Sequence, residues 1–310
     1  MSEHRIVSLL PSATEIVVAL GLKDCLVGCS HECDFPAGLE HLPICCEPTI
    51  DVSASSSEIN SQVEERLANA VSIYRLDTEK ISDLQPTHIL TQMQCEVCAV
   101  SENDVRATVE KLADSKPQVL SLSPGCLADL WQTVRDVATE LDASAQGEEL
   151  VESLQTRLES IRSLATQAEQ RPKVVCIEWL DPLMTAGNWV PELVEIAGGE
   201  NLLGQAGKHS PWLMWEELAE ANPDVIVVLP CGFDLKRTQE EVGVLTDNAA
   251  WNQLKVVREG AVFLADGHNF INRPGPRLVD SAEILAEIFH PELFEPKHRS
   301  AAWTEMSAAQ

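Results

Sequence analysis

Residues Ala145–Gln170 read AQGEELVESLQTRLESIRSLATQAEQ, with no glycine after Gly147 and no proline before Pro172. At a rise of about 1.5 Å per residue, one helix over this stretch would span roughly 39 Å. Its apolar residues recur at spacings of three and four, the pattern of an amphipathic helix. These residues are Val151, Leu154, Leu158, Ile161, Ala165 and Ala168. The sequence therefore predicts one continuous helix near mid-chain.

Short apolar runs alternate with helical patterns on both sides of this stretch, which is typical of α/β proteins with parallel sheets. We interpret the helix as a strut between two Rossmann-like lobes. The predicted divisions are an N-terminal lobe over 1–144, the helix over 145–170, a C-terminal lobe over 171–295 and a tail over 296–310. We expect the tail to be frayed.

The chain of 310 residues carries 22 basic and 49 acidic residues, a net charge of −27. Such a surface repels nucleic acids and anionic lipids, so neither is an expected partner. No long apolar segment suggests membrane insertion.

The apolar run Ile6–Leu10 has about five residues, fewer than the 7–15 of a signal-peptide core. The sequence favours a cytoplasmic location with reduced thiols, or a periplasmic one if the chain is a trimmed mature form.

In the first half, Arg5–Leu10 is a predicted strand, and Ser12 with Glu15 has the spacing of a capping box that starts a helix at Glu15. Residues 45–60 are rich in serine, proline and threonine, so we expect an extended connection outside the core.

A short repeat links the two halves. Glu79 lies seven residues before Pro86, and Glu216 lies seven before Pro223, each in a predicted helix that leads into a strand. A helix that ends at a proline and leads into a strand is common in proteins. The match nevertheless places the two glutamates equivalently in the two lobes.

Soft metal ligands gather in the loops that follow predicted strands. They are His31, Cys33, Cys95, Cys98, Cys126, Cys231 and His268. Loops in this position line the ligand crevice of open α/β sheets. Cys95 and Cys98 form the chain's CxxC pair, which can chelate Zn²⁺ or another soft metal such as Cu(I), act as a redox dithiol, or be structural. Cys33, His31 or Cys45 would complete a metal site.

Other side chains in or near these loops suit a flat ligand. The candidates are Glu178, Trp179, Trp189, Trp212, Phe270, Arg273 and Arg277. Aromatic rings offer apolar walls to a macrocycle, and the two arginines flank a rigid Pro-Gly-Pro turn. His268 would be an axial ligand of a chelated metal, or would hydrogen-bond to a nearby carbonyl.

The chain contains no nucleophile elbow, P-loop, GxGxxG fingerprint or HExxH motif. We therefore expect a binding protein and not an enzyme.

The sequence resembles the helical-backbone class of ABC-transporter substrate-binding proteins, those of the Fe/B12 periplasmic-binding domain, and within it the cobalamin-binding members. The matching stretches are Arg5–Glu15 (RIVSLLPSATE), Ile81–Leu90, Ala197–Leu202 (AGGENL), Pro211–Trp212 and Arg273–Arg277 (RPGPR).

This resemblance implies two α/β lobes bridged by one long helix, with a ligand cleft between them for cobalamin or a related metal chelate of corrinoid, heme or siderophore type. It also implies docking on arginines of an ABC permease by one glutamate of each lobe. These correspond to Glu79 and Glu216, with Glu217 nearly as good a choice. The alternative from the residues is a cytosolic thiol and histidine protein that binds or carries metal and reuses the same fold.

Overall fold

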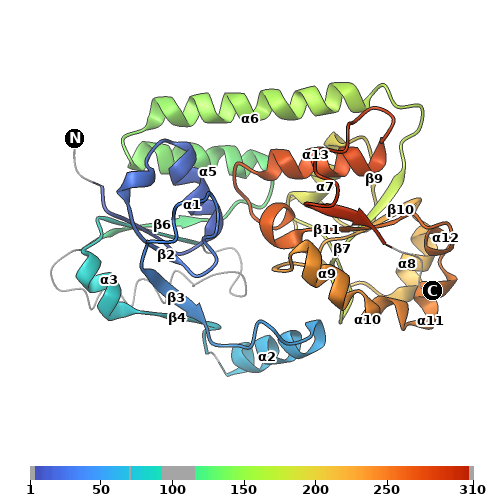
Figure 1. The fold of residues 1–310 in the computed structure, drawn as a ribbon, viewed down its shortest axis with the longest axis horizontal. Helices are drawn as coiled ribbons and strands as arrows, with labels where there is room; N and C mark the ends of the chain where they lie inside the picture. The colour runs from blue at the N-terminus through green and yellow to red at the C-terminus, as the bar shows by residue number, and fades with distance from the viewer. Residues whose placement is uncertain (1–3, 70, 93–115, 307–310) are drawn as a thin grey trace. The chain divides into compact units, whose positions relative to one another are not determined.

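The computed structural model describes residues 4–69, 71–92 and 116–306. It is a mixed α/β protein with two sheets, as expected (Figure 1). The chain forms two compact units. Unit 1 comprises Met1–Ala54, Glu58–Pro124 and Ala128–Ser153, and unit 2 comprises Ser55–Ser57, Gly125–Leu127 and Leu154–Gln310.

The sheet of unit 1 has the strand order β4-β3-β2-β1-β5-β6. Pairing is parallel except between β3 and the edge strand β4. Apolar side chains of β1 and β5 are fully buried, as expected for central strands of a parallel sheet. The strands are β1 Ile6–Ser8, β2 Leu26–Ser30, β3 Ile44–Pro48, β4 Tyr74–Leu76, β5 His88–Gln92 and β6 Gln118–Leu122.

The first helix, α1, begins at Pro11 and ends at Ala19, so the predicted start at Glu15 was wrong. Leu10 is the N-cap, and no side chain caps the helix. Proline at the first helical position is pre-organised for a helix, which moves the start four residues earlier and puts Glu15 inside it. The other helices described in this half are η1 Lys23–Cys25, α2 Ser56–Ala68, α3 Thr78–Leu84 and α5 Leu127–Glu140.

The sheet of unit 2 has the order β12-β11-β10-β7-β8, and β9 also pairs with β7. The central strands β7, β10 and β11 are parallel, whereas β8 and β12 pair antiparallel with their neighbours. The strands are β7 Lys173–Trp179, β8 Met184–Thr185, β9 Glu200–Asn201, β10 Val225–Val228, β11 Val262–Ala265 and β12 Trp303–Glu305. The helices are α7 Val190–Ile196, α8 Trp215–Ala221, α9 Leu235–Glu241, α10 Gly243–Thr246, α11 Ala249–Gln253, α12 Lys255–Arg258, the single-turn π-helix η2 Gly267–Ile271 and α13 Leu278–Phe289.

The long helix predicted over 145–170 is present as α6, Ser144–Ala165. Its apolar stripe is buried from Val151 to Ala165, whereas Ala168 is only half-buried. The predicted end was therefore five residues too late, because the packing that sustains a helix stops at Ala165.

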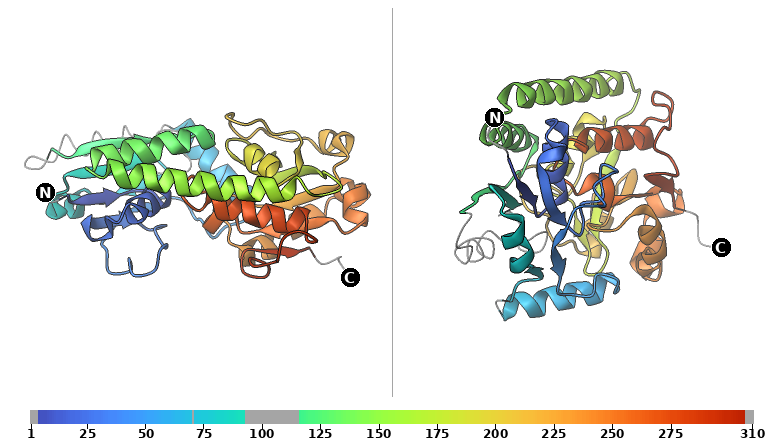
Figure 2. Two further views of the ribbon diagram at one scale, coloured as in Figure 1. Left: turned by 90° about the horizontal axis from the view of Figure 1, so that it is seen from above. Right: turned by 60° about the vertical axis from the view of Figure 1, so that its left-hand side comes forward.

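α6 begins among the residues of unit 1 and ends among those of unit 2. In unit 1 it packs closely on α5 at Gly147, where a Cβ would lie 2.5 Å from the Cβ of Ala138. In unit 2 its C-terminal half runs beside α13 (Figures 1 and 2). There the Arg157 guanidinium lies 2.8 Å from Asp280 and 3.0 Å from Glu283.

Residues 297–306 are not frayed, contrary to expectation. Trp303–Glu305 forms β12, antiparallel to β11. The Trp303 ring is buried, and its Nε1–H donates to Glu287 at 2.7 Å. This buried contact holds the strand in place through residue 305.

Residues 45 and 46 also differ from expectation. Both cysteines lie in β3, and both are buried in the core of unit 1. Strand pairing with β2 overrides the polar composition of the stretch that follows.

Within the described parts of the chain, no helix combines the length and the apolar character needed to cross a membrane.

Candidate functional site

The carboxyl ends of β7, β10 and β11 lie at one edge of the sheet of unit 2, because these strands are parallel. Their loops are bonded to one another. Cys231 donates its N–H to the Glu178 carbonyl at 3.0 Å, and His268 donates its N–H to the Phe233 carbonyl at 2.9 Å. The structure thus brings three of the predicted loops together.

The turn after β11 is packed against the backbone of the loop after β10. A Cβ on Gly267 would lie 2.1 Å from the Pro230 carbonyl oxygen, so only glycine fits there. Asp266 caps the turn: its carboxylate accepts from the Asn269 N–H at 2.7 Å and from the Asn269 amide at 2.8 Å. Burial raises the pKa of Asp266. The backbone that presents His268 is therefore tightly fixed.

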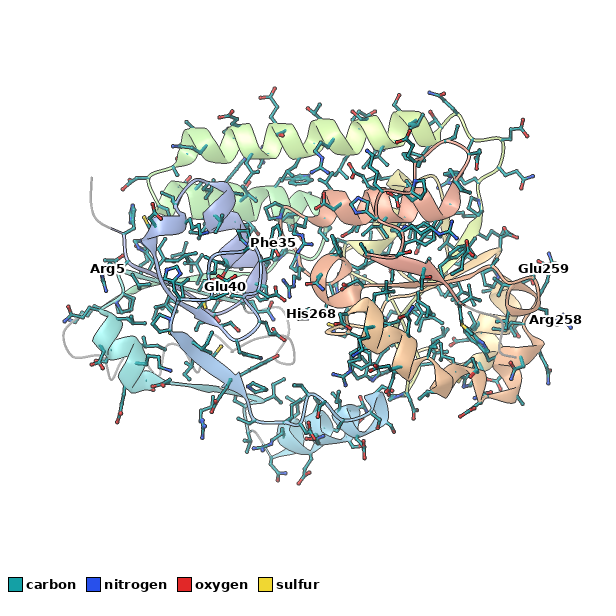
Figure 3. The ribbon with its side chains drawn as sticks, viewed as in Figure 1. Arg5, Phe35, Glu40, Arg258, Glu259 and His268 are labelled. Atoms are coloured by element: carbon teal, nitrogen blue, oxygen red, sulfur yellow. The ribbon has the colours of Figure 1, made fainter. Side chains whose placement is uncertain are left out.

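His268 does not stand alone at this edge. Its Nε2 lies 2.8 Å from Nη2 of Arg273, whose side chain is buried. A guanidinium only donates hydrogen bonds, so Nε2 of His268 is the acceptor in this contact. Binding of a metal at Nε2 would require this bond to open. Figure 3 shows His268 on the coil of η2.

Two guanidinium groups lie over aromatic rings in the same loops. Arg277 lies 4.2 Å from the centroid of Phe270, and Arg237 lies 3.9 Å from that of Phe233. The centroid of the Trp179 ring lies 5.4 Å from that of Phe233. These contacts are favourable and fix the directions of the cations.

The remaining candidates of unit 2 divide by burial. The Trp189 ring is buried, and its Nε1–H donates to the Ile271 carbonyl at 2.8 Å, so it supports η2 from beneath. Trp212 is 58% exposed and therefore available to a ligand. Glu178 accepts from the Ser210 hydroxyl at 2.7 Å.

In unit 1, cysteine side chains gather near the carboxyl end of β2 and on the neighbouring strand β3. Cys33 follows β2 in a turn closed by its N–H to the Ser30 carbonyl at 3.1 Å. Its sulfur lies 3.0 Å from the Thr14 hydroxyl. His31 lies in this turn, with Nδ1 3.2 Å from the Cys46 carbonyl oxygen.

Most of these thiols are held protonated. Burial raises the pKa of Cys45 to about 12 and that of Cys46 to about 11. The hydrogen bond with Cys29, together with burial, raises the pKa of Cys33, whereas the same bond lowers the pKa of Cys29. Because thiolates and not thiols ligate metals, this group is poorly prepared for a metal ion.

The metal-site expectation finds no support. Among the residues that the structure describes, no group of three or more His, Cys, Asp or Glu side chains is arranged to hold a metal. Cys95 and Cys98 lie outside the described residues. Cys176 is buried in β7, as expected of a structural cysteine.

The two glutamates of the repeat lie in equivalent places. α3 and α8 each end at a left-handed residue, Gln85 or Asn222, directly before the proline. Glu79 and Glu216 are both exposed in the first turns of these helices. Glu217 differs, because its carboxylate accepts from the Met214 N–H at 2.9 Å and so caps its own helix.

Sequence reasoning missed three residues of the unit 2 edge: Phe233, Arg237 and Asp266. Asp266 comes directly after β11 and Phe233 lies in the loop after β10, so their position was a usable signal. Arg237 lies inside α9 and reaches the edge only through its side chain, which no local pattern reveals.

Comparison with known proteins agrees with this architecture. A substrate-binding lipoprotein of an ABC transporter from Bacillus subtilis, YvrC, is 24% identical over 302 residues, which cover 94% of this chain and 81% of the relative. The vitamin B12-binding protein of Vibrio parahaemolyticus is 23% identical over 288 residues, covering 92% and 89%. The crystal structure of Staphylococcus aureus IsdE with heme has a TM-score of 0.70 at 19% identity, covering 93% of this chain and 100% of that one.

The family model described as periplasmic binding protein matches residues 6–268. This range includes every strand of both sheets except β12. It also includes the residues of the unit 2 edge up to His268. Since the match covers more than half of the chain, the protein belongs to the periplasmic binding protein family.

Proposed function

We propose that this protein is the receptor of an ABC transporter for a metal chelate, with cobalamin as the first candidate and heme as the second. It binds its ligand without chemical change and hands it to a membrane permease.

The observation that carries the proposal is the edge of the unit 2 sheet. It combines aromatic rings, two ring-stacked guanidinium groups and an imidazole on loops that are bonded to one another. Apolar walls with a few fixed polar groups are the general form of a cofactor site. A flat macrocycle with polar side groups suits this combination.

Relatives support both ligand candidates. One is a vitamin B12-binding protein, and another, IsdE, belongs to a heme uptake system. Each is about one quarter identical to this chain, so the choice between a corrinoid and a heme rests on measurement.

The proposed location is outside the cytoplasmic membrane. The relatives include a lipoprotein and periplasmic binding proteins. The cytoplasmic expectation, and with it the alternative of a cytosolic thiol protein that carries metal, finds no support in these relatives or in the described residues.

The test is titration of the purified protein with cyanocobalamin, hemin and a ferric hydroxamate siderophore, followed by visible absorbance and calorimetry. One of the three is expected to bind at one equivalent. Binding of none of them would reject the proposal.

Two variants locate the site. Trp212→Ala and Arg277→Ala are each expected to lower the affinity for the ligand about tenfold, which corresponds to a loss of roughly 1.4 kcal/mol of binding free energy. Met214→Ala is the matched control for Trp212, because Met214 is 62% exposed two residues away. Arg258→Ala is the control for Arg277, since Arg258 lies on α12, well away from His268 (Figure 3). Equal affinity of all four variants would place the ligand elsewhere.

The permease partner has its own test. Glu79 and Glu216 are exposed, and arginine is the natural counterpart of an exposed carboxylate in an interface. Glu79→Arg and Glu216→Arg are each expected to keep ligand affinity and to lose stimulation of the ATPase of a reconstituted ABC permease from the same organism. Unchanged stimulation would remove these residues from the docking surface.

A further inference from the structure

Unit 2 has a groove that is lined by α8 on one side and by α11 and α12 on the other. Its volume is about 380 Å³. Trp215 of α8 lines it, and the Trp215 ring packs edge-on against the buried ring of Trp251 in α11, with the centroids 6.4 Å apart. Ala219, Pro223 and Leu254 line the same groove. Much of its lining is therefore apolar and is anchored in the core of unit 2.

Two side chains of opposite charge also line the groove. Glu216 belongs to α8 and Arg258 to α12, and both are exposed. Among the described residues, neither has a hydrogen-bond or ion-pair partner, and the two do not pair with each other. Lys255, which also lines the groove, pairs instead with Glu259 at 3.7 Å. In a chain with 49 acidic and 22 basic residues, an arginine without a carboxylate partner in the described part is unusual.

The groove lies away from the candidate ligand site. α8 leads into β10 and α12 leads into β11, so Pro223 and Arg258 precede these strands. The candidate ligand site is formed instead by the loops that follow β7, β10 and β11. Figure 3 shows Arg258 well away from His268. A partner in the groove therefore does not compete with a ligand at that site.

We propose that this groove receives a loop of the ABC permease. A basic side chain of the loop binds Glu216, a carboxylate binds Arg258, and an apolar side chain between them packs on Trp215. This inference rests on the proposed function, because it extends docking by Glu216 to a groove with a second contact of opposite charge.

The lining of the groove suits a protein better than a small molecule. Protein interfaces combine an apolar centre with a polar, exposed rim, and tryptophan and arginine are enriched among the residues that contribute most to binding. Small-molecule sites instead bury most of the ligand surface. Charges of opposite sign on the two sides of the groove also fix the orientation of the loop, since a reversed loop would bring like charges together.

The first test reverses the charge of Arg258. Binding of the full-length protein without added ligand to the reconstituted permease in lipid nanodiscs is measured by biolayer interferometry. Arg258→Glu is expected to weaken this binding about tenfold, because it places two carboxylates opposite each other. Arg162→Glu is the matched control, since Arg162 is exposed on α6 and its pair with Glu159 is exposed as well. The control is expected to bind within about twofold of the wild type.

The second test fills the groove without a change of charge. Ala219 is exposed on α8, so Ala219→Trp places a large ring in the groove and is expected to weaken permease binding about tenfold. Ala145→Trp is the control, because Ala145 is exposed on α6. All four variants are expected to keep the ligand affinity of the wild type in the titration described above.

The outcomes separate this inference from the function on which it rests. If Glu216→Arg abolishes permease binding while Arg258→Glu and Ala219→Trp bind like the wild type, the groove is not the docking site and the proposed function stands. If the wild-type protein itself does not bind the permease, both the groove and the permease partner are rejected. If Ala219→Trp fails to fold by circular dichroism, Arg258→Glu and its control decide the outcome.

Discussion

Unit 1 and unit 2 both place loops at the carboxyl ends of parallel strands, yet they fill that edge with different chemistry. In unit 1 the described part of this edge holds thiols, those of Cys29, Cys33 and Cys46. In unit 2 it holds cations fixed by partners, such as Arg273 on His268 and Arg277 over Phe270. The unit 1 edge is lined by cysteine side chains, whereas the unit 2 edge is lined by polar and aromatic side chains held in place by their partners.

This difference shows how one fold type serves two purposes. Fixed polar groups are pre-organised, so little ordering entropy opposes recognition of a ligand. Buried thiols pack like small apolar groups. We therefore expect unit 2 to be the less tolerant of substitution near its strand ends, and the following comparisons measure this.

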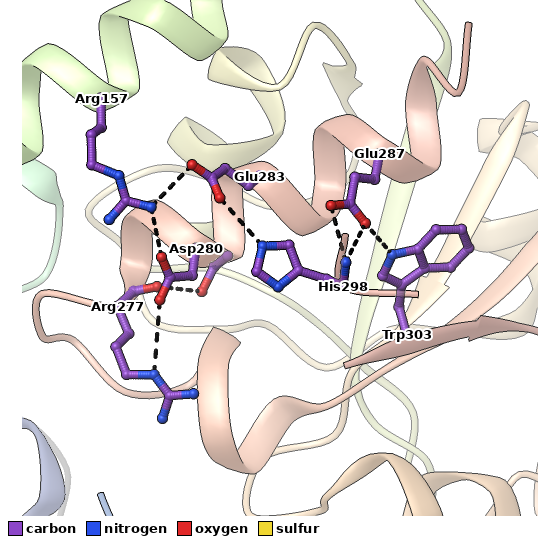
Figure 4. Close-up of polar contacts among 8 residues, drawn as sticks. Arg157, Arg277, Asp280, Glu283, Glu287, His298 and Trp303 are labelled. Atoms are coloured by element: carbon purple, nitrogen blue, oxygen red, sulfur yellow. Dashed lines mark hydrogen bonds and ion pairs between the residues drawn. The ribbon is translucent and has the colours of Figure 1, made fainter. Parts of the chain in front are cut away.

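The largest difference is expected between the antiparallel edge strands of the two sheets. Trp303 of β12 is buried and donates to the buried carboxylate of Glu287 (Figure 4). Tyr74 of β4, in contrast, is only half-buried. Trp303→Ala removes a large ring and one partner of Glu287, so we expect a loss of ~3–5 kcal/mol in the free energy of unfolding. Tyr74→Ala is expected to cost about 1–2 kcal/mol.

Urea denaturation monitored by hydrogen exchange assigns each loss to its own sheet. Faster exchange is expected in β11 for Trp303→Ala and in β3 for Tyr74→Ala. If Tyr74→Ala is the less stable of the two variants, the expectation that unit 2 tolerates substitution less well than unit 1 is wrong.

The second comparison uses one glycine from each unit. A Cβ at Gly267 would meet backbone oxygens of Pro230 and Leu229 at 2.1 and 2.7 Å. A Cβ at Gly28 would meet the ends of two side chains, Cys45 at 2.6 Å and Leu84 at 2.8 Å. Backbone cannot move aside as a side chain can, so Gly267→Ala should cost ~2–3 kcal/mol and Gly28→Ala about 1 kcal/mol. Midpoints of thermal unfolding check the order, which the opposite ranking would contradict.

Much of this architecture is predictable from sequence because it depends on local patterns. The stripe from Val151 to Ala165 predicted α6, and apolar runs with proline or glycine boundaries predicted the central strands. The predictions were wrong where a contact between residues distant in the sequence determines the local structure. β12 exists because Trp303 finds a buried partner, and β3 exists because β2 pairs with it.

The sequence could predict which loops form the candidate site, but not which side chains contact one another within it. Strand ends correctly indicated that the segments containing Trp179 and His268 meet at one edge. No pattern indicates that Arg273 would occupy Nε2 of His268, because that bond depends on the path of η2 in space. The role of Cys95 and Cys98 stays a prediction.

The third comparison concerns pH. In unit 2, Glu283 bonds to His298 at 3.3 Å and to Arg157, and these partners lower its pKa from 4.5 to about 2 (Figure 4). Its contribution to stability is present above pH 4.5 and is lost as the pH falls towards 2. The same bond raises the pKa of His298, so that contribution is present below 6.5 and is lost as the pH rises through the raised value.

Both contributions are therefore complete between pH 4.5 and 6.5. Within this window Glu283→Gln is expected to cost ~1–2 kcal/mol, and the cost should shrink at lower and higher pH. Glu47→Gln in unit 1 is the control, because the Glu47 pair with Arg75 is exposed and such pairs contribute little. Urea midpoints across pH 2–9 measure both variants. A pH-independent cost for Glu283→Gln would contradict this account.

The smallest effects are expected at the two helices of the repeat. In α3 the N-cap is Asp77, which accepts from the Lys80 N–H at 3.0 Å and leaves Glu79 outside the capping bonds. In α8 the bond to the Met214 N–H is made by Glu217, which leaves Glu216 outside them.

Loss of a capping carboxylate costs about 0.5–1 kcal/mol, so Glu217→Gln should lower the unfolding midpoint by roughly 1–4 °C. Glu79→Gln and Glu216→Gln should leave the midpoint unchanged, because neither carboxylate has a hydrogen-bond or ion-pair partner among the described residues. Differential scanning calorimetry resolves shifts of this size. If Glu216→Gln is destabilising and Glu217→Gln is not, then Glu216 is the structural residue of α8 and Glu217 becomes the better candidate for docking. If the two units behave as predicted, Glu79 and Glu216 are dispensable for folding, and any loss of transport in these variants reports on the partner alone.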